Sequence, residues 1–186
     1  MRMYKEYSYN GWQDHVAEIK NFLEEKNFKY LDGSLEEENF IIVMDHEDIN
    51  KYVPSLINFF KDNNLSISCI MLHGSCNTSD PPLNLHIDQI PLMEKFYYSP
   101  YAINLPIQNV EGTYLAYYEI IDPSFELKED AAFTENEVKE ITRVNYNEPL
   151  IVRIDKLHAV CNVSDKCRIT ASIRFTESLE EYFTHA

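Results

Sequence analysis

Apolar residues recur every three or four positions in the early part of the chain, which is the spacing of amphipathic helices. This spacing predicts a first helix over about residues 12–26. A similar series predicts a second helix that begins near Asn50 and runs to about Asp62, with Pro54 in its first turn. Between the two lies a five-residue apolar run, 40–44, which predicts a short strand.

Beyond Leu65 the pattern changes to short β-branched and aromatic runs that are separated by turn residues. Eight such runs predict strands, and they span residues 66–72, 84–88, 101–107, 113–120, 138–144, 149–154, 158–163 and 168–175. The pattern predicts a mainly β fold with N-terminal helices, of the double-stranded β-helix type (a jelly roll, cupin-like). We expect residues 1–186 to form one domain. Its parts would be an α+β support (1–65), a β-helix core (66–176) and a C-terminal tail (177–186).

Composition and charge narrow the classes of partner. Hydrophobic residues make up 45% and aromatic residues 13% of the 186 positions, which favours a folded globule over a disordered chain. The formal net charge of −15 repels phosphate backbones and anionic lipid surfaces, so nucleic acid is disfavoured as a partner. No apolar run has the length of a membrane span, which predicts no membrane association and a cytoplasmic location. The oligomeric state is left open.

A candidate metal site begins at His86-Ile87-Asp88. In an extended strand, residues two apart point to the same face, so His86 and Asp88 can reach one metal ion while Ile87 points away. His158 would supply a second imidazole from another strand. Two imidazoles and one carboxylate form the facial triad that binds ferrous iron in non-haem oxygenases. A His-x-Asp sequence alone also occurs by chance, so the downstream residues determine whether it indicates a metal site.

The order His86-x-Asp88, His158, Arg168-x-Thr170 resembles the Fe(II)/2-oxoglutarate-dependent dioxygenase superfamily. In that superfamily an arginine follows the second histidine by about ten positions, and a serine or threonine follows two positions later. The segments 102–107 and 112–118 are also similar to the strands that follow HxD in small microbial and phage-type members. The resemblance covers roughly residues 66–176. Thr170 stands where serine is commoner, and it keeps the hydroxyl.

The resemblance implies a set of roles. His86, Asp88 and His158 would be the catalytic Fe(II) ligands. The guanidinium of Arg168 would bind the distal carboxylate of 2-oxoglutarate, because its geometry matches a carboxylate bidentately, and the Thr170 hydroxyl would support that carboxylate. The reaction would consume O2 and convert 2-oxoglutarate to succinate and CO2 while hydroxylating a small molecule or a protein side chain. The sequence does not distinguish a small-molecule substrate from a protein side chain.

Further polar residues have open roles. Asn104 is a polar residue on an apolar strand, and it is either a cosubstrate contact, as we assign it, or a core amide with its own partner. Arg174 follows Arg168 by six positions, as in the nucleic-acid demethylase branch of the superfamily. The acidic charge argues against that branch and predicts a structural role for Arg174. His73 is expected to be an ordinary histidine. One tyrosine is expected to contact 2-oxoglutarate, from the candidates Tyr97, Tyr98, Tyr101, Tyr114, Tyr117 and Tyr118.

Two rival functions use the same residues. A metal hydrolase would employ His86, Asp88 and His158 with a general base near the metal, and it would not need a carboxylate clamp, so Arg168 argues against it. A jelly-roll binding or structural protein would keep the fold without turnover. Succinate release that depends on ferrous iron and O2 separates all three.

Overall fold

A computed structural model of the chain describes residues 2–26, 28, 39–75, 85–88, 99–122, 137–164 and 166–184. Its strands are β1 (Tyr4–Glu6), β2 (Phe40–Met44), β3 (Ile67–Ser75), β4 (Tyr101–Gln108), β5 (Thr113–Ile120), β6 (Val138–Asn145), β7 (Leu150–Arg153), β8 (His158–Asn162) and β9 (Arg168–Phe175). Its helices are α1 (Trp12–Glu25), α2 (His46–Tyr52), α3 (Pro54–Asp62) and α4 (Glu180–Thr184). Within the described residues, no helix combines the length and the apolar character needed to cross a membrane.

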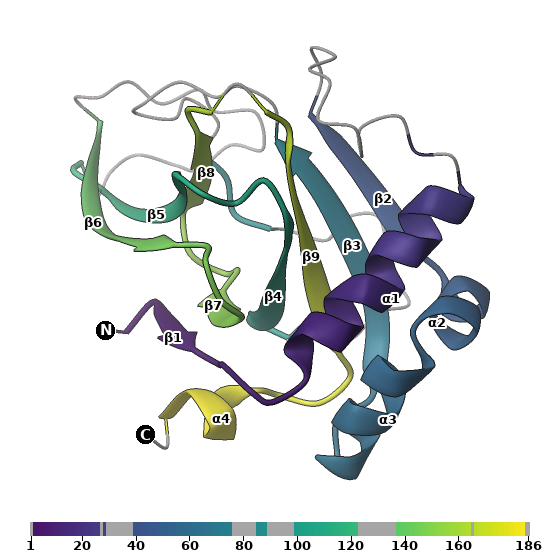
Figure 1. Cartoon of the computed structure of the whole chain (residues 1–186). Coiled ribbons are helices and arrows are strands. Elements are labelled where there is room, and N and C mark those ends of the chain that lie inside the picture. The colour runs from purple at the N-terminus through teal and green to yellow at the C-terminus, as the bar shows by residue number, and fades with distance from the viewer. Residues whose placement is uncertain are drawn as a thin grey trace.

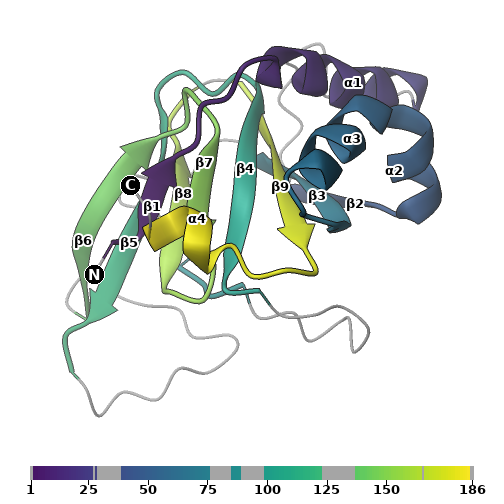
Figure 2. The same cartoon turned by 90° about the horizontal axis from the view of Figure 1, so that it is seen from below.

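The strands form two antiparallel sheets (Figure 1). The larger sheet has the order β1-β7-β4-β9-β3-β2, and the smaller has the order β6-β5-β8. Helices α1, α2 and α3 lie on one side of the larger sheet, and Figure 2 shows the smaller sheet on the other side, next to the β1 and β7 end. The face of the larger sheet that turns away from these helices is called the inner face below.

Strand β9 shows how the sequence divides between the two faces. All eight of its residues are buried, although they alternate between apolar and polar types. The apolar set Ile169, Ala171, Ile173 and Phe175 joins the core beneath the helices, together with residues such as Phe22 and Leu56. Because neighbouring residues of a strand point to opposite faces, Arg168, Thr170, Ser172 and Arg174 lie on the inner face. These four polar side chains are therefore buried on the inner face, opposite the apolar side chains of the same strand.

A second core joins the two sheets. Ala102 on β4 and Val152 on β7 pack with Leu115 and Tyr117 on β5. This cluster fixes the smaller sheet over the β7 and β4 part of the inner face, beside the buried polar residues of β9.

The expected β-rich fold with N-terminal helices is confirmed at the level of two antiparallel sheets with helices on one side. The first helix and the strand at 40–44 are confirmed as α1 and β2. The expectation that 84–88 forms a strand is met only by a single bridge, between His86 and His158. Residue 84 lies outside the described part of the chain.

The second predicted helix is wrong in its start and its continuity. The chain forms two helices there, and the first begins at His46, because the Asp45 side chain accepts hydrogen bonds of 2.9 Å from the backbone N–H groups of Glu47 and Asp48. The break falls at Val53, whose φ of −127° and ψ of 47° are not helical. A residue that precedes proline is sterically pushed out of the helical region, so Pro54 starts a new helix.

Both ends of the described chain carry structure that the pattern did not predict. Strand β1 pairs with β7. The predicted tail contains α4, and Leu179 just before it is fully buried in the core beneath the helices. That one domain spans residues 1–186 stays a prediction.

Phe60 provides a test of the core beneath the helices. It is fully buried, and its ring packs edge-to-face on Phe175 with the ring centroids 4.8 Å apart. We expect Phe60→Ala to lower the free energy of unfolding by about 3–5 kcal/mol in urea denaturation, because it leaves a cavity. The control Ile121→Ala, at a side chain that is 55% exposed, should change it by less than about 0.5 kcal/mol. Equal effects of the two substitutions would contradict this packing.

Candidate metal centre

The His-x-Asp segment lies alongside the start of β8. The N–H of His86 donates to the carbonyl of His158, and the N–H of His158 donates to the carbonyl of His86, both at 2.9 Å. Leu85 and Ile87 pack against the apolar cluster on the far side of the smaller sheet. The residues between them, His86 and Asp88, therefore point to the same side as His158, as the alternation of an extended segment requires.

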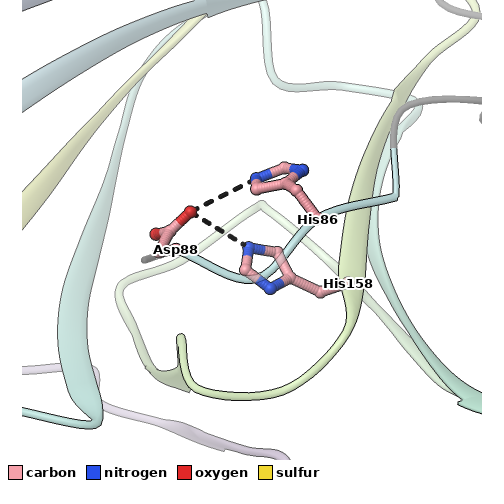
Figure 3. A group of neighbouring side chains, drawn as sticks. All are labelled: His86, Asp88 and His158. Atoms are coloured by element: carbon pink, nitrogen blue, oxygen red, sulfur yellow. Dashed lines mark ion pairs between the residues drawn. The ribbon is translucent and has the colours of Figure 1, made fainter. Parts of the chain in front are cut away.

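The three side chains converge (Figure 3). Oδ1 of Asp88 lies 3.3 Å from Nε2 of His86 and 3.7 Å from Nε2 of His158. One ligand atom from each residue lies within 4.8 Å of the others. Ligands at right angles around an ion, each about 2.1 Å from it, would be about 3 Å apart. The group of His86, Asp88 and His158 could thus hold a metal ion if its ligand atoms moved closer together.

The hydrogen bond made by Nδ1 of His158 determines whether Nε2 carries a proton. Nδ1 lies 2.7 Å from the carbonyl oxygen of Lys156, to which it donates a proton. Nε2 is then the unprotonated nitrogen and offers its lone pair toward Asp88 and His86. Burial lowers the pKa of His158 to about 4, against the opposing charge of Asp88. The imidazole is therefore neutral near pH 7, which metal binding requires.

Arg174 orients the carboxylate of Asp88. Its Nη2 donates to Oδ2 of Asp88 at 2.6 Å, and the two side chains are only 5% and 19% exposed. Burial by itself raises the pKa of Asp88, but the hydrogen bond from His86 and the charges of His158 and Arg174 hold it well below its usual range. Arg174, expected from the sequence to be structural, thus contacts a candidate ligand directly and leaves Oδ1 to face the imidazoles.

Arg168 is a buried cation whose described neighbour is the Tyr146 side chain. It is 1% exposed, and its three guanidinium nitrogens have no hydrogen-bond partner among the described residues. Its guanidinium carbon lies 4.1 Å from the ring centroid of Tyr146, so the aromatic face is the contact that stabilises it. Burial lowers the pKa of Arg168, although an arginine stays charged at any physiological pH. No described residue supplies the anion that normally accompanies a buried charge of this kind.

The other two residues expected to bind cosubstrate lie on the same inner face. Thr170 is 3% exposed and stands two positions from Arg168 on β9. Asn104 lies opposite Ser172 on the neighbouring strand β4. Its amide nitrogen donates to the Tyr146 hydroxyl at 2.9 Å, whereas its buried carbonyl oxygen has no partner among the described residues. The amide nitrogen of Asn104 is thus hydrogen-bonded within the core, whereas its carbonyl oxygen could accept a hydrogen bond from a ligand.

Two residues of this region were not selected from the sequence. Tyr146 contacts both Arg168 and Asn104, but it lies in a turn after β6 that carries no motif. His73 lies directly opposite Thr170 in the larger sheet, which places it on the inner face. Burial lowers the pKa of His73 to about 4, and Asp88 opposes that shift while Arg174 and Arg168 add to it. The alternation of β3 alone could have indicated that His73 faces inward.

The tyrosines proposed from the sequence have other surroundings where they are described. The Tyr117 hydroxyl donates to the backbone carbonyl of Arg153 and accepts from its N–H, both at 3.1 Å. Tyr114 and Tyr118 belong to the cluster on the far side of the smaller sheet, and Tyr101 belongs to the core beneath the helices. Tyr97 and Tyr98 lie outside the described residues.

Comparison with known proteins adds no relative. No protein-family model matches the chain, and a search of curated proteins finds no matching sequence.

Metal titration tests the centre. We expect His86→Ala and Asp88→Ala each to weaken Co²⁺ binding at least about 100-fold, because each removes a ligand. Arg174→Met should weaken it about 10–100-fold by releasing Asp88. His46→Ala, at an exposed histidine that begins α2, is the control and should leave the affinity unchanged. Visible absorption spectra during the titration report the binding, and wild-type affinity in the Asp88 variant would remove that residue from the ligand set.

Proposed function

We propose that this protein is an Fe(II)- and 2-oxoglutarate-dependent dioxygenase that hydroxylates a C–H bond of its substrate. The observation that carries the proposal is the buried guanidinium of Arg168, which has no acceptor among the described residues and shares the inner face with Arg174, the residue that holds Asp88. A site of this kind combines a metal-binding group with a place for a carboxylate.

The connectivity supports a double-stranded β-helix. In chain order, the eight segments are β3, 85–88, β4, β5, β6, β7, β8 and β9. The larger sheet contains the first, eighth, third and sixth of these segments as neighbours, in the order β3-β9-β4-β7. The smaller sheet contains the second, seventh, fourth and fifth, in the order 85–88, β8, β5, β6. Segments that alternate between two facing sheets in this order are typical of a jelly roll. The metal group would then lie between the sheets, where the second and seventh segments meet.

The donor set fits ferrous iron. Two imidazole nitrogens and one carboxylate oxygen, contributed by His86, His158 and Asp88, are the ligands of the 2-His-1-carboxylate triad. Bound iron, with 2-oxoglutarate and O2, would supply the oxidising power for attack on a C–H bond. The protein's own residues keep His158 in the required tautomer through Lys156 and keep Asp88 aligned through Arg174.

The charge of the inner face favours a small dianion. Arg168 and Arg174 bring two positive charges there, and Asp88 brings one negative charge. A carboxylate on Arg168 would accept two parallel N–H bonds, and the Tyr146 ring beneath the guanidinium limits its rotation. The Thr170 hydroxyl lies on the same strand face, and the Asn104 carbonyl oxygen can accept from a protonated group or a bound water. These residues would orient 2-oxoglutarate and exclude bulk water from it.

One observation keeps the metal hydrolase as the second candidate. His73 is neutral near pH 7 and lies within the field of Asp88, Arg168 and Arg174, so it could act as the general base that such an enzyme needs. The hydrolase would not consume 2-oxoglutarate. Formation of succinate therefore decides between the two.

Succinate assays of Arg168 variants test the clamp. We expect Arg168→Ala to weaken 2-oxoglutarate binding by about 2–5 kcal/mol, because a buried carboxylate would lose its counter-charge. Arg168→Lys should recover only part of the affinity, since an ammonium cannot bind bidentately. Arg143→Ala, which removes an exposed arginine paired with Glu140, is the control. An unchanged Michaelis constant for 2-oxoglutarate in the alanine variant would rule out this role for Arg168.

Stability measurements give a second, independent test. Without 2-oxoglutarate, Arg168→Met should raise the free energy of unfolding by about 1–4 kcal/mol, because it replaces a buried charge, which no described carboxylate contacts, by an apolar chain. Adding 2-oxoglutarate to the iron-loaded wild type at about 100 times its Kd should stabilise it by about 2.7 kcal/mol, and should not stabilise the variant. A strongly destabilised variant would indicate that the charge has a structural partner.

A further inference from the structure

Strand β3 brings a histidine to the inner face. Leu72 is fully buried in the core beneath the helices. Because neighbouring residues of a strand point to opposite faces, His73 lies on the inner face, where it is partly exposed. Figure 1 shows β3 beside β9, the strand that carries Arg168 and Thr170. His73 is therefore part of the face on which the candidate site is built.

The register of the sheet sets His73 directly opposite Thr170. Side chains paired in this way have Cβ atoms about 4.5–5.5 Å apart, so the two can contact one small group together. The same row continues to Ile41 on β2 and to Pro106 on β4. Neither of these outer residues has a hydrogen-bonding side chain. In this row, the polar side chains are therefore the adjacent pair His73 and Thr170.

The imidazole of His73 also lies within range of both charged ends of the site. Burial is the main cause that lowers the pKa of His73 to about 4, the carboxylate of Asp88 opposes this shift, and the charges of Arg174 and Arg168 add to it. Arg168 stands two positions from Thr170, so it is a diagonal neighbour of His73, at about 7–8 Å, which long side chains can span. A ligand that contacts Arg168 and Thr170 can thus reach His73 as well.

The end of β3 that carries His73 is tied to the neighbouring strands. The backbone carbonyl of Ser75 accepts a hydrogen bond of 2.6 Å from the side-chain amide of Asn162, at the end of β8. Asn162 is fully buried, and its amide also donates to the carbonyl of Lys166, just before β9. These bonds join β3 to the strand of His158 and to the start of β9. His73 is accordingly presented by a supported strand, which favours precise contact with a ligand.

We propose that His73 is a cosubstrate-binding residue, which donates a hydrogen bond to the distal carboxylate of 2-oxoglutarate together with Arg168 and Thr170. This role rests on the proposed oxygenase function, because the ligand is the cosubstrate of that reaction. It differs from the general-base role that a metal hydrolase would give to the same imidazole.

The hydrogen-bonding capacity of a carboxylate accounts for the third residue. A carboxylate has two oxygens with about four lone-pair sites. The guanidinium of Arg168 can occupy two of them and the Thr170 hydroxyl a third. An N–H of His73 would occupy the remaining one. Because the imidazole is neutral near pH 7, it adds a donor without adding a buried positive charge beside Arg168 and Arg174.

This role makes His73 specific for one end of the ligand. It contributes to the binding of a 2-oxo acid that has a second carboxylate, and it does not contribute to the binding of one that lacks it. A residue needed only for packing of the sheet would affect both acids alike. The selectivity between two such acids therefore separates a binding role from a structural one.

Calorimetric titrations of the full chain, loaded with ferrous iron and kept free of O2, measure this selectivity. The probes are 2-oxoglutarate and 2-oxopentanoate, which has a methyl group in place of the distal carboxylate. We expect the wild type to bind 2-oxoglutarate about 100-fold more tightly, because 2-oxopentanoate brings no carboxylate to Arg168. His73→Leu should reduce this ratio at least about tenfold by weakening 2-oxoglutarate alone, since it removes a hydrogen bond to a charged group.

Two further variants control for the fold. His73→Gln keeps an N–H donor on the side chain, and it should recover most of the ratio. Met71→Leu is the matched control, because Met71 lies on the same face of β3, two positions away and opposite Ser172. It should leave both affinities unchanged.

Nuclear magnetic resonance of isotope-labelled histidine gives a readout on the unaltered chain. With Zn²⁺ in place of iron the sample is diamagnetic, and the ring-nitrogen signals of His73 are identified by their loss in His73→Gln. Addition of 2-oxoglutarate should move these signals, whereas 2-oxopentanoate should leave them in place.

Three results would overturn the role of His73. They are an unchanged ratio in His73→Leu, an equal loss of both acids in that variant without recovery in His73→Gln, and ring signals that do not respond to 2-oxoglutarate. Any of them, together with succinate formation by the wild type, leaves the oxygenase standing. A wild type that binds no 2-oxoglutarate with ferrous iron and forms no succinate would instead refute the proposed function, and the role of His73 with it.

Discussion

The candidate site depends on one pair of backbone hydrogen bonds, those that His86 and His158 exchange. They fix the register between the His-x-Asp segment and β8, two parts of the chain that are distant in sequence. With this register, the alternation of an extended segment sends His86 and Asp88 to the side of His158 and sends Leu85 and Ile87 into an apolar cluster. A slip of one residue would reverse both assignments and would bury two polar side chains in that cluster.

Strand β9 links this pair to the rest of the molecule. Its apolar residues hold the larger sheet to the helices, while its polar residues bring two guanidiniums to the inner face. Arg174 is neutralised by Asp88, whereas among the described residues Arg168 is contacted by the Tyr146 ring and by no carboxylate. The cost of burying Arg168 must be offset by the surrounding core. Local rules of this kind are commonly broken at functional sites.

The period of two in a strand and the ten-residue offset of Arg168 made part of the site predictable. Strand alternation places His86 and Asp88 on one face, whereas His158 and Arg168 were selected because their order and offset resemble the dioxygenase superfamily. Three contacts could not be found in this way: the hydrogen bond from Arg174 to Asp88, the position of His73 opposite Thr170, and the contact of Tyr146 with Arg168. They depend on pairings between distant strands or on a turn without a motif. The start of α2 was missed because Asp45 was not considered as a cap, and the split was missed because Pro54 was placed inside the first turn of one continuous helix. The β-rich fold could be predicted from the pattern of strand-like runs. The order of the strands in the two sheets could be determined only from the structure.

Calorimetric titration of 2-oxoglutarate into the anaerobic protein, with and without ferrous iron, tests the central claim most directly. A cosubstrate held at one end by Arg168 and at the other by the metal should bind to a single site, and at least about tenfold more tightly when iron is present. Binding that is absent, or that is equally strong without iron, would contradict the account.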